Sequence, residues 1–403
     1  MKFLLIPGNN SLSHIGKCAA LASELSARGH TVLTAVSGKY VDFLRLIGLP
    51  HAVLPDIQES DDGSLPSLAW FRSHRRLVAC IQSEVELIES FRPDRVIGVF
   101  RFTLKVSAAL LGVPYDAVAC GCMMPDVTEI LGYEVGEAGA ADQALFLKNF
   151  FRYAGKRMGM AMQSLGLAPL WDMRDFLIGD RTFLWDYPQF MPLPKMADRH
   201  HIGPIFWTRW PDLSGAPETF PEKTRPLALV SLGTRQACRP VVLKIVHCLI
   251  KSGFNVLVAC GGHPALMHIL PGESHLRCWR FAPVGELLRQ AQLLVCHGGQ
   301  MTIFEALMQR VPVLVVPFHP EQAHNGLCVE RIKCGRRLLP PTAFKGDLQA
   351  YADTFAGQSD ADIIQTIEQI VCDQSIAEGL RQAQNVLRSY DAPVMMADFL
   401  ERA

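Results

Sequence analysis

The sequence has little charge and no excess of either sign. Charged residues make up 19% of its 403 residues, and Lys plus Arg equals Asp plus Glu, at 39 each. A chain without net charge has no overall field that attracts nucleic acid or an anionic membrane. No apolar run approaches the roughly eighteen residues of a membrane-spanning helix, and the N-terminal run is too short for a secretory signal. We therefore expect a cytoplasmic protein without a transmembrane segment or a nucleic-acid partner.

Several motifs of common enzyme classes are also absent. The twelve cysteines include no C-x-x-C pair. Cys120 and Cys122 are too close together for a metal site or an ordinary disulfide, so buried thiols in a reducing compartment are expected. The chain has no P-loop lysine motif, no G-x-G-x-x-G fingerprint and no G-x-S-x-G elbow. Kinase, dehydrogenase and hydrolase functions therefore lack support.

Apolar residues are plentiful, at 49%, and the length allows two domains of about 200 residues each. Basic clusters at 72–76 and 331–337 are expected to be solvated faces, with contact to an anionic acceptor as the alternative. Segment 141–165 carries Phe and Met at helical spacings. Core packing and a pocket for an apolar acceptor are both open explanations for this segment.

One stretch has the pattern of a strand, a glycine-rich turn, a helix and a second strand. Leu293–Cys296 is an apolar run typical of a buried parallel strand, and His297–Gly299 interrupts it. Thr302–Gln309 has a helical pattern, which Pro312 ends before the next apolar run, Val313–Val316. The order predicts a βαβ unit. Its turn lies beyond the carboxyl end of the first strand, where open parallel sheets bind ligands.

The residues of this turn suit the diphosphate of a nucleotide. Gly298 and Gly299 allow backbone N–H groups to approach an anion closely. The helix that follows directs the positive end of its dipole to the same place. The side chains of His297 and Thr302 can add hydrogen bonds to phosphate oxygens. An ordinary strand-to-helix turn is the alternative for the three turn residues taken alone.

Three later side chains make a nucleotide site the better interpretation. Glu305 lies one turn after Thr302 on the same helix face, where its carboxylate can accept hydrogen bonds from ribose hydroxyls. Glu321 and Gln322 follow the second strand and offer an acceptor and an amide that suit the hydroxyls of a sugar.

The stretch HGGQMTIFEAL…VPVLVVPFHPEQAHN resembles the donor-site signature of the UDP-glycosyltransferase-like family, of the macrolide and natural-product type. That signature has an H-x-G-x-x-[ST]-x-x-E core and a later Asp/Glu-Gln pair. The resemblance implies an α/β protein of the GT-B fold, with two Rossmann-like domains whose parallel sheets face across a cleft. It also implies a metal-independent, inverting glycosyltransferase of the hexosyltransferase type. The co-substrate would be a UDP- or dTDP-sugar, with no further cofactor, and the acceptor a small molecule.

The resemblance assigns roles to residues elsewhere in the chain. His14 lies at the first βα turn, where the family has its catalytic histidine. Phe281 occupies the position of an aromatic residue that stacks on the nucleobase. The residues expected to bind the donor are Ser231, Gly233, Thr234, Phe281, Ala282, His297, Gly298, Gly299, Thr302, Glu305, Glu321 and Gln322.

The same resemblance suggests how the chain is divided. The tetrapeptide His201–Pro204 looks like the boundary of the first domain, and the segment after it is rich in proline. We predict an acceptor-binding Rossmann-like domain over 1–205 and a linker over 206–226. A nucleotide-sugar-binding Rossmann-like domain follows over 227–380, and a terminal helix over 381–403 that crosses back to the first domain. A homodimer is left open.

Sugar transfer to a hydroxyl needs a base, for which His14 is the candidate. An imidazole with its ordinary pKa of about 6.5 is largely neutral near pH 7. Family members often pair this histidine with an acid near the strand before Pro114, but Val96–Arg101 contains no carboxylate. Asp116, Asp126 and Glu129 are alternative partners. The missing acid supports a second hypothesis, a catalytically silent GT-B protein that acts as a partner or activator of another enzyme.

Overall fold

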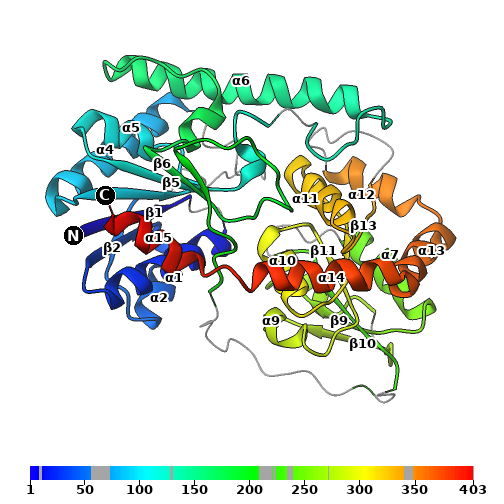
Figure 1. Ribbon diagram of the computed structural model, residues 1–403. Coiled ribbons are helices and arrows are strands. Elements are labelled where there is room, and N and C mark those ends of the chain that lie inside the picture. The colour runs from blue at the N-terminus through cyan, green and yellow to red at the C-terminus, as the bar shows by residue number, and fades with distance from the viewer. Residues whose placement is uncertain are drawn as a thin grey trace. The chain divides into compact units, whose positions relative to one another are not determined.

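The computed structural model describes residues 1–8, 11–55, 73–127, 130–207, 220, 224–233, 239–270, 272–339 and 348–402. Contacts within the chain divide it into two units (Figure 1). Unit 1 consists of Met1–Thr128, Leu145–Arg209 and Tyr390–Ala403, and unit 2 of Glu129–Ala144 and Trp210–Ser389. Most of the linker predicted over 206–226 lies outside the described residues.

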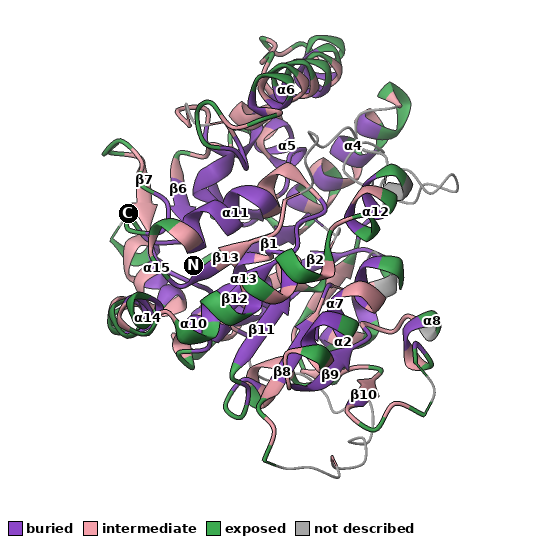
Figure 2. Ribbon diagram, turned by 90° about the vertical axis from the view of Figure 1, so that its right-hand side faces the viewer, coloured by how far each residue is buried: buried purple, intermediate pink, exposed green. Residues whose placement is uncertain are grey.

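Unit 1 is built on a seven-stranded parallel sheet in the order β3-β2-β1-β4-β5-β6-β7. Its central strands are apolar because helices cover both faces of such a sheet, and Figure 2 shows β1 as buried. The strand order reverses between β1 and β4, which is the topological switch point of a Rossmann-like sheet. The strands are β1 (Lys2–Pro7), β2 (Thr31–Val36), β3 (His51–Val53), β4 (Arg95–Val99), β5 (Tyr115–Ala119), β6 (Arg181–Leu184) and β7 (Arg199–His201).

Three helices of unit 1, α1, α4 and α15, begin at polar caps that the sequence contains. Ser11 accepts a hydrogen bond from the backbone N–H of His14 and so caps α1, and Ser73 caps α4 in the same way. The α-helices are α1 (Leu12–Ala27), α2 (Val41–Leu46), α4 (His74–Phe91), α5 (Leu104–Leu111), α6 (Ala140–Ser164, which starts in unit 2) and α15 (Ala392–Glu401). Short 3₁₀ turns are η1 (Gly38–Tyr40), η2 (Gly121–Met123) and η3 (Met173–Leu177).

The last helix packs against the first (Figure 1). Arg28, at the end of α1, donates hydrogen bonds to Asp398 at 2.7 Å and to Glu401 at 2.9 Å. The segment Ile376–Leu400 belongs to two helices, which are separated by Arg388–Asp391. Asp391 caps the second of these, α15, whose first turn contains Pro393.

Unit 2 is built on a six-stranded parallel sheet in the order β10-β9-β8-β11-β12-β13. This order also reverses once, between β8 and β11, whose residues pair from Leu293 and Ala228 to Cys296 and Ser231. The strands are β8 (Leu227–Ser231), β9 (Asn255–Ala259), β10 (Leu276–Trp279), β11 (Leu293–Cys296), β12 (Val313–Val315) and β13 (Gly335–Arg337).

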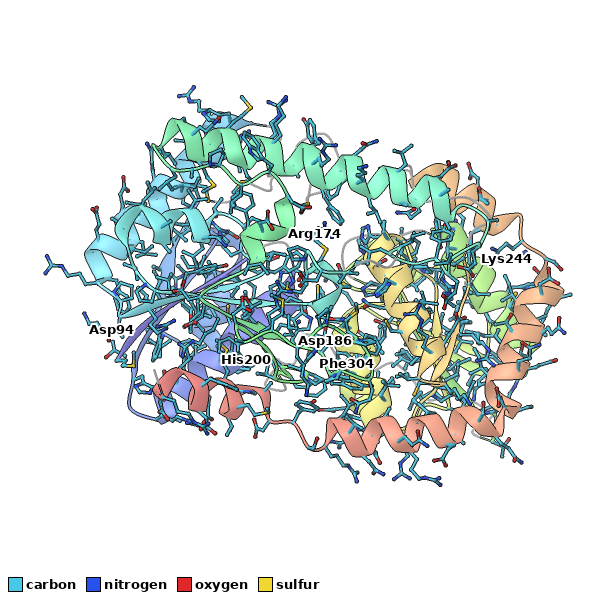
Figure 3. The ribbon with its side chains drawn as sticks, turned by 45° about the horizontal axis from the view of Figure 1, so that its top comes forward. Asp94, Arg174, Asp186, His200, Lys244 and Phe304 are labelled. Carbon is cyan, nitrogen blue, oxygen red and sulfur yellow. The ribbon has the colours of Figure 1, made fainter. Side chains whose placement is uncertain are left out.

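The helices of unit 2 cover this sheet. Asp360, in the first turn of α13, accepts hydrogen bonds from Lys244 at 2.6 Å (Figure 3) and from Lys251 at 3.1 Å. These bonds lower the pKa of Asp360 to about 2. The helices are α7 (Arg239–Lys251), α8 (Pro264–Met267), α9 (Val284–Leu287), α10 (Gln300–Met308), α11 (Pro320–Arg331), α12 (Leu348–Ala356), α13 (Asp360–Cys372) and α14 (Gln374–Leu387).

The cysteines and helices agree with two predictions from composition. The eleven cysteines in the described ranges are free thiols, and nine of them are buried. None of the helices formed by the described residues is long and apolar enough to cross a bilayer.

Candidate functional site

The glycine-rich turn lies where the sequence predicted it, between β11 and α10. Gly298 has a φ of +94°, and a Cβ atom there would lie 2.5 Å from the carbonyl oxygen of Gln322. Both the backbone conformation and the lack of space therefore require glycine. Gly299 is the N-cap of α10, and no side chain caps this helix. The positive end of the α10 dipole is directed at this turn, where it favours an anion.

The end of β8 lies beside this turn, at the switch point of the sheet. Nδ1 of His297 is 3.5 Å from the carbonyl oxygen of Ser231. Gly233 has a φ of +93°, and a Cβ atom there would lie 3.3 Å from the His297 ring. The structure therefore brings Ser231, Gly233 and His297 together, whereas the predicted Thr234 lies outside the described residues.

Acidification is expected to destabilise unit 2 through His297. Burial lowers the pKa of its imidazole below the ordinary value of about 6.5. Near pH 6 the unfolded chain therefore binds a proton that the folded chain does not, so the free energy of unfolding falls as the pH drops through about 6.5. Urea denaturation at several pH values measures this slope. His297→Gln should show a shallower slope than the natural chain, and identical slopes would contradict the assignment.

Two buried amides support the turn from behind. Asn325 donates from Nδ2 to the carbonyl oxygen of Gly298 at 2.8 Å, and Gln300 donates to Oδ1 of Asn325 at 3.2 Å. Asn325 is fully buried and Gln300 almost so. Sequence reasoning gave neither residue a role. Each is a polar residue at a buried helix position. This burial can be recognised only when the element that packs against the helix is known.

The nucleobase and ribose candidates lie along the same edge of the sheet. The Phe281 ring lies against Gly262, where an added Cβ would be 2.9 Å from it, and Ala282 follows in the loop before α9. Thr302 and Glu305 are half-buried on α10. The Glu305 carboxylate reaches α9, since its Oε1 lies 3.7 Å from the position of a Cβ on Gly285.

The sugar candidates lie in the first turn of α11. Oε1 of Gln322 accepts a hydrogen bond from the backbone N–H of Phe318 at 2.8 Å, and Glu321 precedes it. The backbone of Gln322 also touches the Gly298 turn. All predicted donor residues that the structure describes therefore follow the carboxyl ends of β8 to β12.

A segment from earlier in the chain braces α11 within unit 2. Gly132 has a φ of +93°, and a Cβ there would meet the Cβ of Ala323 at 2.5 Å. Arg337, on β13, donates to the carbonyl oxygen of Gly132, to Glu137 at 2.8 Å and to Glu330 at 2.8 Å. These contacts fix the start of α11 and were not expected from the sequence.

The proposed base, His14, lies at the switch point of unit 1. It is in the first turn of α1, just beyond the end of β1. Its ring packs against Phe100 and Trp185, with ring centroids 5.2 and 5.8 Å away. The ammonium group of Lys17, one turn further along α1, lies 4.6 Å from the centre of the Trp185 ring.

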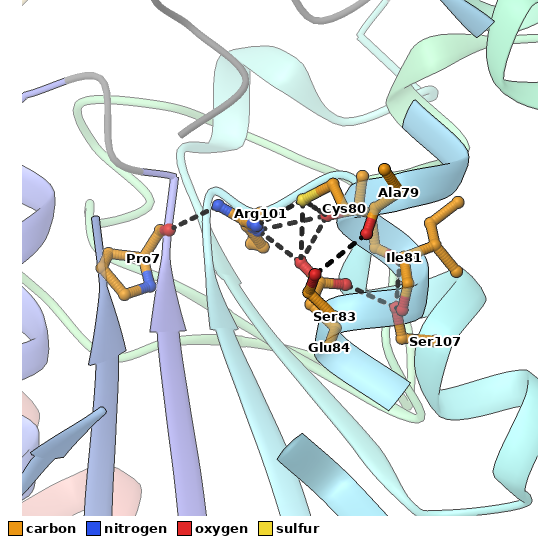
Figure 4. Close-up of polar contacts among 9 residues, drawn as sticks. Pro7, Ala79, Cys80, Ile81, Ser83, Glu84, Arg101 and Ser107 are labelled. Carbon is orange, nitrogen blue, oxygen red and sulfur yellow. Dashed lines mark hydrogen bonds and ion pairs between the residues drawn. The ribbon is translucent and has the colours of Figure 1, made fainter. Parts of the chain in front are cut away.

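Arg101, the residue after Phe100, forms a buried ion pair with Glu84 (Figure 4). Nε of Arg101 donates to Glu84 at 2.7 Å, and Nη1 donates to the carbonyl oxygen of Pro7 at 3.4 Å. Thr103 donates to the same carboxylate at 2.6 Å, and Ser107 donates to its other oxygen. Arg101 and Glu84 are 1% and 0% exposed. Because water cannot solvate either charge, both charges depend on these partners. The network holds together the ends of β1 and β4, beside His14.

Two of the acidic residues considered as alternative partners of His14 are among the described residues, and both contact arginines instead. Both oxygens of Asp116 accept from Arg95 and Arg181, at the amino end of β5 and thus opposite the edge that carries His14. Asp126 forms an ion pair with Arg199. Glu129 lies outside the described residues.

Comparison with known proteins shows which glycosyltransferases the chain is similar to. Residues 228–353 match the model of the glycosyltransferase family 28 C-terminal domain. A PGL/p-HBAD biosynthesis rhamnosyltransferase of Mycobacterium bovis (strain BCG / Pasteur 1173P2) is 26% identical over 353 residues, which are 83% of this chain and 76% of that protein. The demethyllactenocin mycarosyltransferase of Streptomyces fradiae is 29% identical over 211 residues, 51% of this chain and 41% of that protein.

Solved structures share the whole fold. The glycotransferase of kitacinnamycin superposes with a TM-score of 0.74 at 18% identity, covering 100% of this chain and 98% of that chain. The spinosyn rhamnosyltransferase SpnG, complexed with thymidine diphosphate, superposes with a TM-score of 0.68 at 18% identity, and both chains are fully covered. The predicted α/β architecture of the GT-B fold and the resemblance noted in the sequence are therefore confirmed, and the chain is similar to GT-B glycosyltransferases of the natural-product type.

Proposed function

We propose that this glycosyltransferase moves a sugar from a nucleoside diphosphate sugar to a hydroxyl of an apolar small molecule, with inversion. The observation that carries the proposal is the convergence of His297, the glycine turn and the N-terminus of α10 at the switch point between β8 and β11. Each of these groups can bind or neutralise phosphate oxygens. They would hold the departing diphosphate without a metal ion or a further cofactor.

The relatives support the choice of substrates. Their names include a rhamnosyltransferase and a mycarosyltransferase, and two structural neighbours were solved with thymidine diphosphate. A dTDP-sugar is therefore our first choice of donor, with a UDP-sugar as the second. The demethyllactenocin and zeaxanthin in the relatives' names favour an apolar acceptor.

The proposed reaction assigns one role to each group. His14 takes the proton of the acceptor hydroxyl, whose oxygen then attacks the anomeric carbon as the bond to the diphosphate breaks. Phe281 stacks on the base, Glu305 binds the ribose, and Glu321 and Gln322 bind the sugar. The aromatic rings around His14 limit the access of water to the base. The silent GT-B protein is the alternative, because Asp116 is held by arginines away from His14.

Nucleotide binding tests the donor site directly. His297→Ala is expected to weaken the binding of dTDP or UDP by about 1–3 kcal/mol, the range for losing a hydrogen bond to a charged group. Isothermal titration calorimetry measures the change. His247→Ala on α7 is the matched control, since His247 contacts Asp360 and none of the donor candidates. An unchanged dissociation constant for both nucleotides in His297→Ala would contradict the site.

A further inference from the structure

The long helix α6 has one face that is firmly packed within unit 1. Phe151, Met158 and Met162 are buried on this face. Gly155 and Gly159 lie so close to Leu170 and Trp171 that an added Cβ would approach their backbone to within 2.2 and 2.5 Å. The glycines therefore fix how the helix is rotated. The residues on its other face are presented outward by the fold itself, as the exposed colour along α6 in Figure 2 shows.

The outward face combines apolar side chains with uncompensated positive charge. Leu145, Tyr153, Met160 and the neighbouring Trp171 are 60%, 46%, 42% and 49% exposed. The sequence between Asp142 and Asp172 contains no acidic residue and four basic ones, although the whole chain has no net charge. None of the four forms an ion pair with any described residue, whereas nearby Arg174 (Figure 3) is paired with Asp172. The basic residues are Lys148, Arg152, Lys156 and Arg157.

Aromatic and basic side chains also form a shallow hollow on this face. An open pocket of about 450 Å³ is lined by Asn149, Arg152, Tyr153, Lys156 and Trp171. The guanidinium of Arg157 lies 5.3 Å from the centre of the Tyr153 ring. We name the exposed side chains of 145–160 together with Trp171 the α6 face.

This chemistry fits a bilayer that contains anionic lipids. Trp and Tyr favour the level of the lipid headgroups, and Lys and Arg are attracted to anionic headgroups while apolar neighbours enter the acyl boundary. A second copy of the chain would oppose like charges if it docked through the same face. We propose that the α6 face binds the surface of anionic membranes. This inference goes beyond the proposed reaction and can be tested without any substrate.

Cosedimentation of the full-length protein with lipid vesicles tests the proposal. The protein is expected to bind vesicles of phosphatidylcholine mixed with phosphatidylglycerol, to bind pure phosphatidylcholine far less, and to dissociate as salt is raised. The triple variant Lys148→Glu/Arg152→Glu/Lys156→Glu should lower partitioning into anionic vesicles roughly a hundredfold. Leu145→Ser/Met160→Ser should also lower it while leaving every charge in place.

A matched variant separates the α6 face from overall charge. Arg75→Glu/Arg289→Glu/Arg388→Glu makes the same change in net charge at exposed positions elsewhere, and should retain at least about half of the binding, because attraction falls off within a Debye length. Circular dichroism checks that all variants are folded. Failure of the natural chain to bind anionic vesicles, equal binding to neutral ones, or equal losses in the two triple variants would each overturn the proposal.

Discussion

Replacing Glu84 by alanine is expected to lower the free energy of unfolding by about 3–5 kcal/mol, the range for removing one partner of a buried ion pair. The carboxylate is fully buried and accepts hydrogen bonds from Arg101, Thr103 and Ser107. Without it the guanidinium of Arg101 remains buried, with neutral hydrogen-bond acceptors but without a counter-charge. Urea denaturation of the natural chain and the variant measures the difference.

Two further variants show whether the charge itself is responsible. Glu84→Gln keeps the size of the side chain and part of its hydrogen bonding, and should be intermediate. Asp42→Ala removes an exposed ion pair with Arg45, whose side chains are 93% and 66% exposed, and should change stability little. If Glu84→Gln is as stable as the natural chain, the ion pair does not stabilise the fold as we infer.

His14→Ala is expected to lower the rate of sugar transfer by about 10²–10⁴-fold, the range for losing a positioned general base. The affinity for dTDP should stay nearly the same, because the donor candidates are all in unit 2. Steady-state kinetics with a dTDP-sugar, or slow hydrolysis of the donor when no acceptor is known, measures the rate. His51→Ala serves as the control, since His51, on β3, bonds to the carbonyl oxygen of Leu49.

The same experiment distinguishes the two functional hypotheses. If the natural chain binds dTDP but turns over no sugar nucleotide, and His14→Ala behaves identically, the silent partner is the correct interpretation. Turnover that survives in His14→Ala would retain the enzyme and reject His14 as its base.

Sequence patterns predicted most of the central strands because their signal is local. Leu293–Cys296 is a strand with the predicted bounds, and the strand predicted over Val313–Val316 ends one residue earlier, since each is an apolar run. The short edge strands β7 (Arg199–His201) and β13 (Gly335–Arg337) have a polar composition that is typical of loops. Their pairing depends on a neighbouring strand far away in the sequence.

The same distinction applies to the candidate site. The turn at His297–Gly299 could be predicted from its glycines and from the helix that follows it. However, α10 begins at Gln300, two residues before the predicted start, because its N-cap has no side chain that would mark the start in the sequence. Glu84 lies on the amphipathic helix α4, but its burial depends on Arg101, which arrives from the end of β4. Asn325 likewise acquires its role only when α11 packs against the turn.

Because α15 belongs to unit 1, the ribosome begins unit 1 first but completes it last. Unit 2 is fully translated at Ser389, when unit 1 still lacks Tyr390–Ala403. Until those residues leave the ribosome, Arg28 lacks the carboxylates of Asp398 and Glu401, and Arg181 lacks the carbonyl oxygen of Phe399. A late stop codon would therefore impair the half of the enzyme that the ribosome started first.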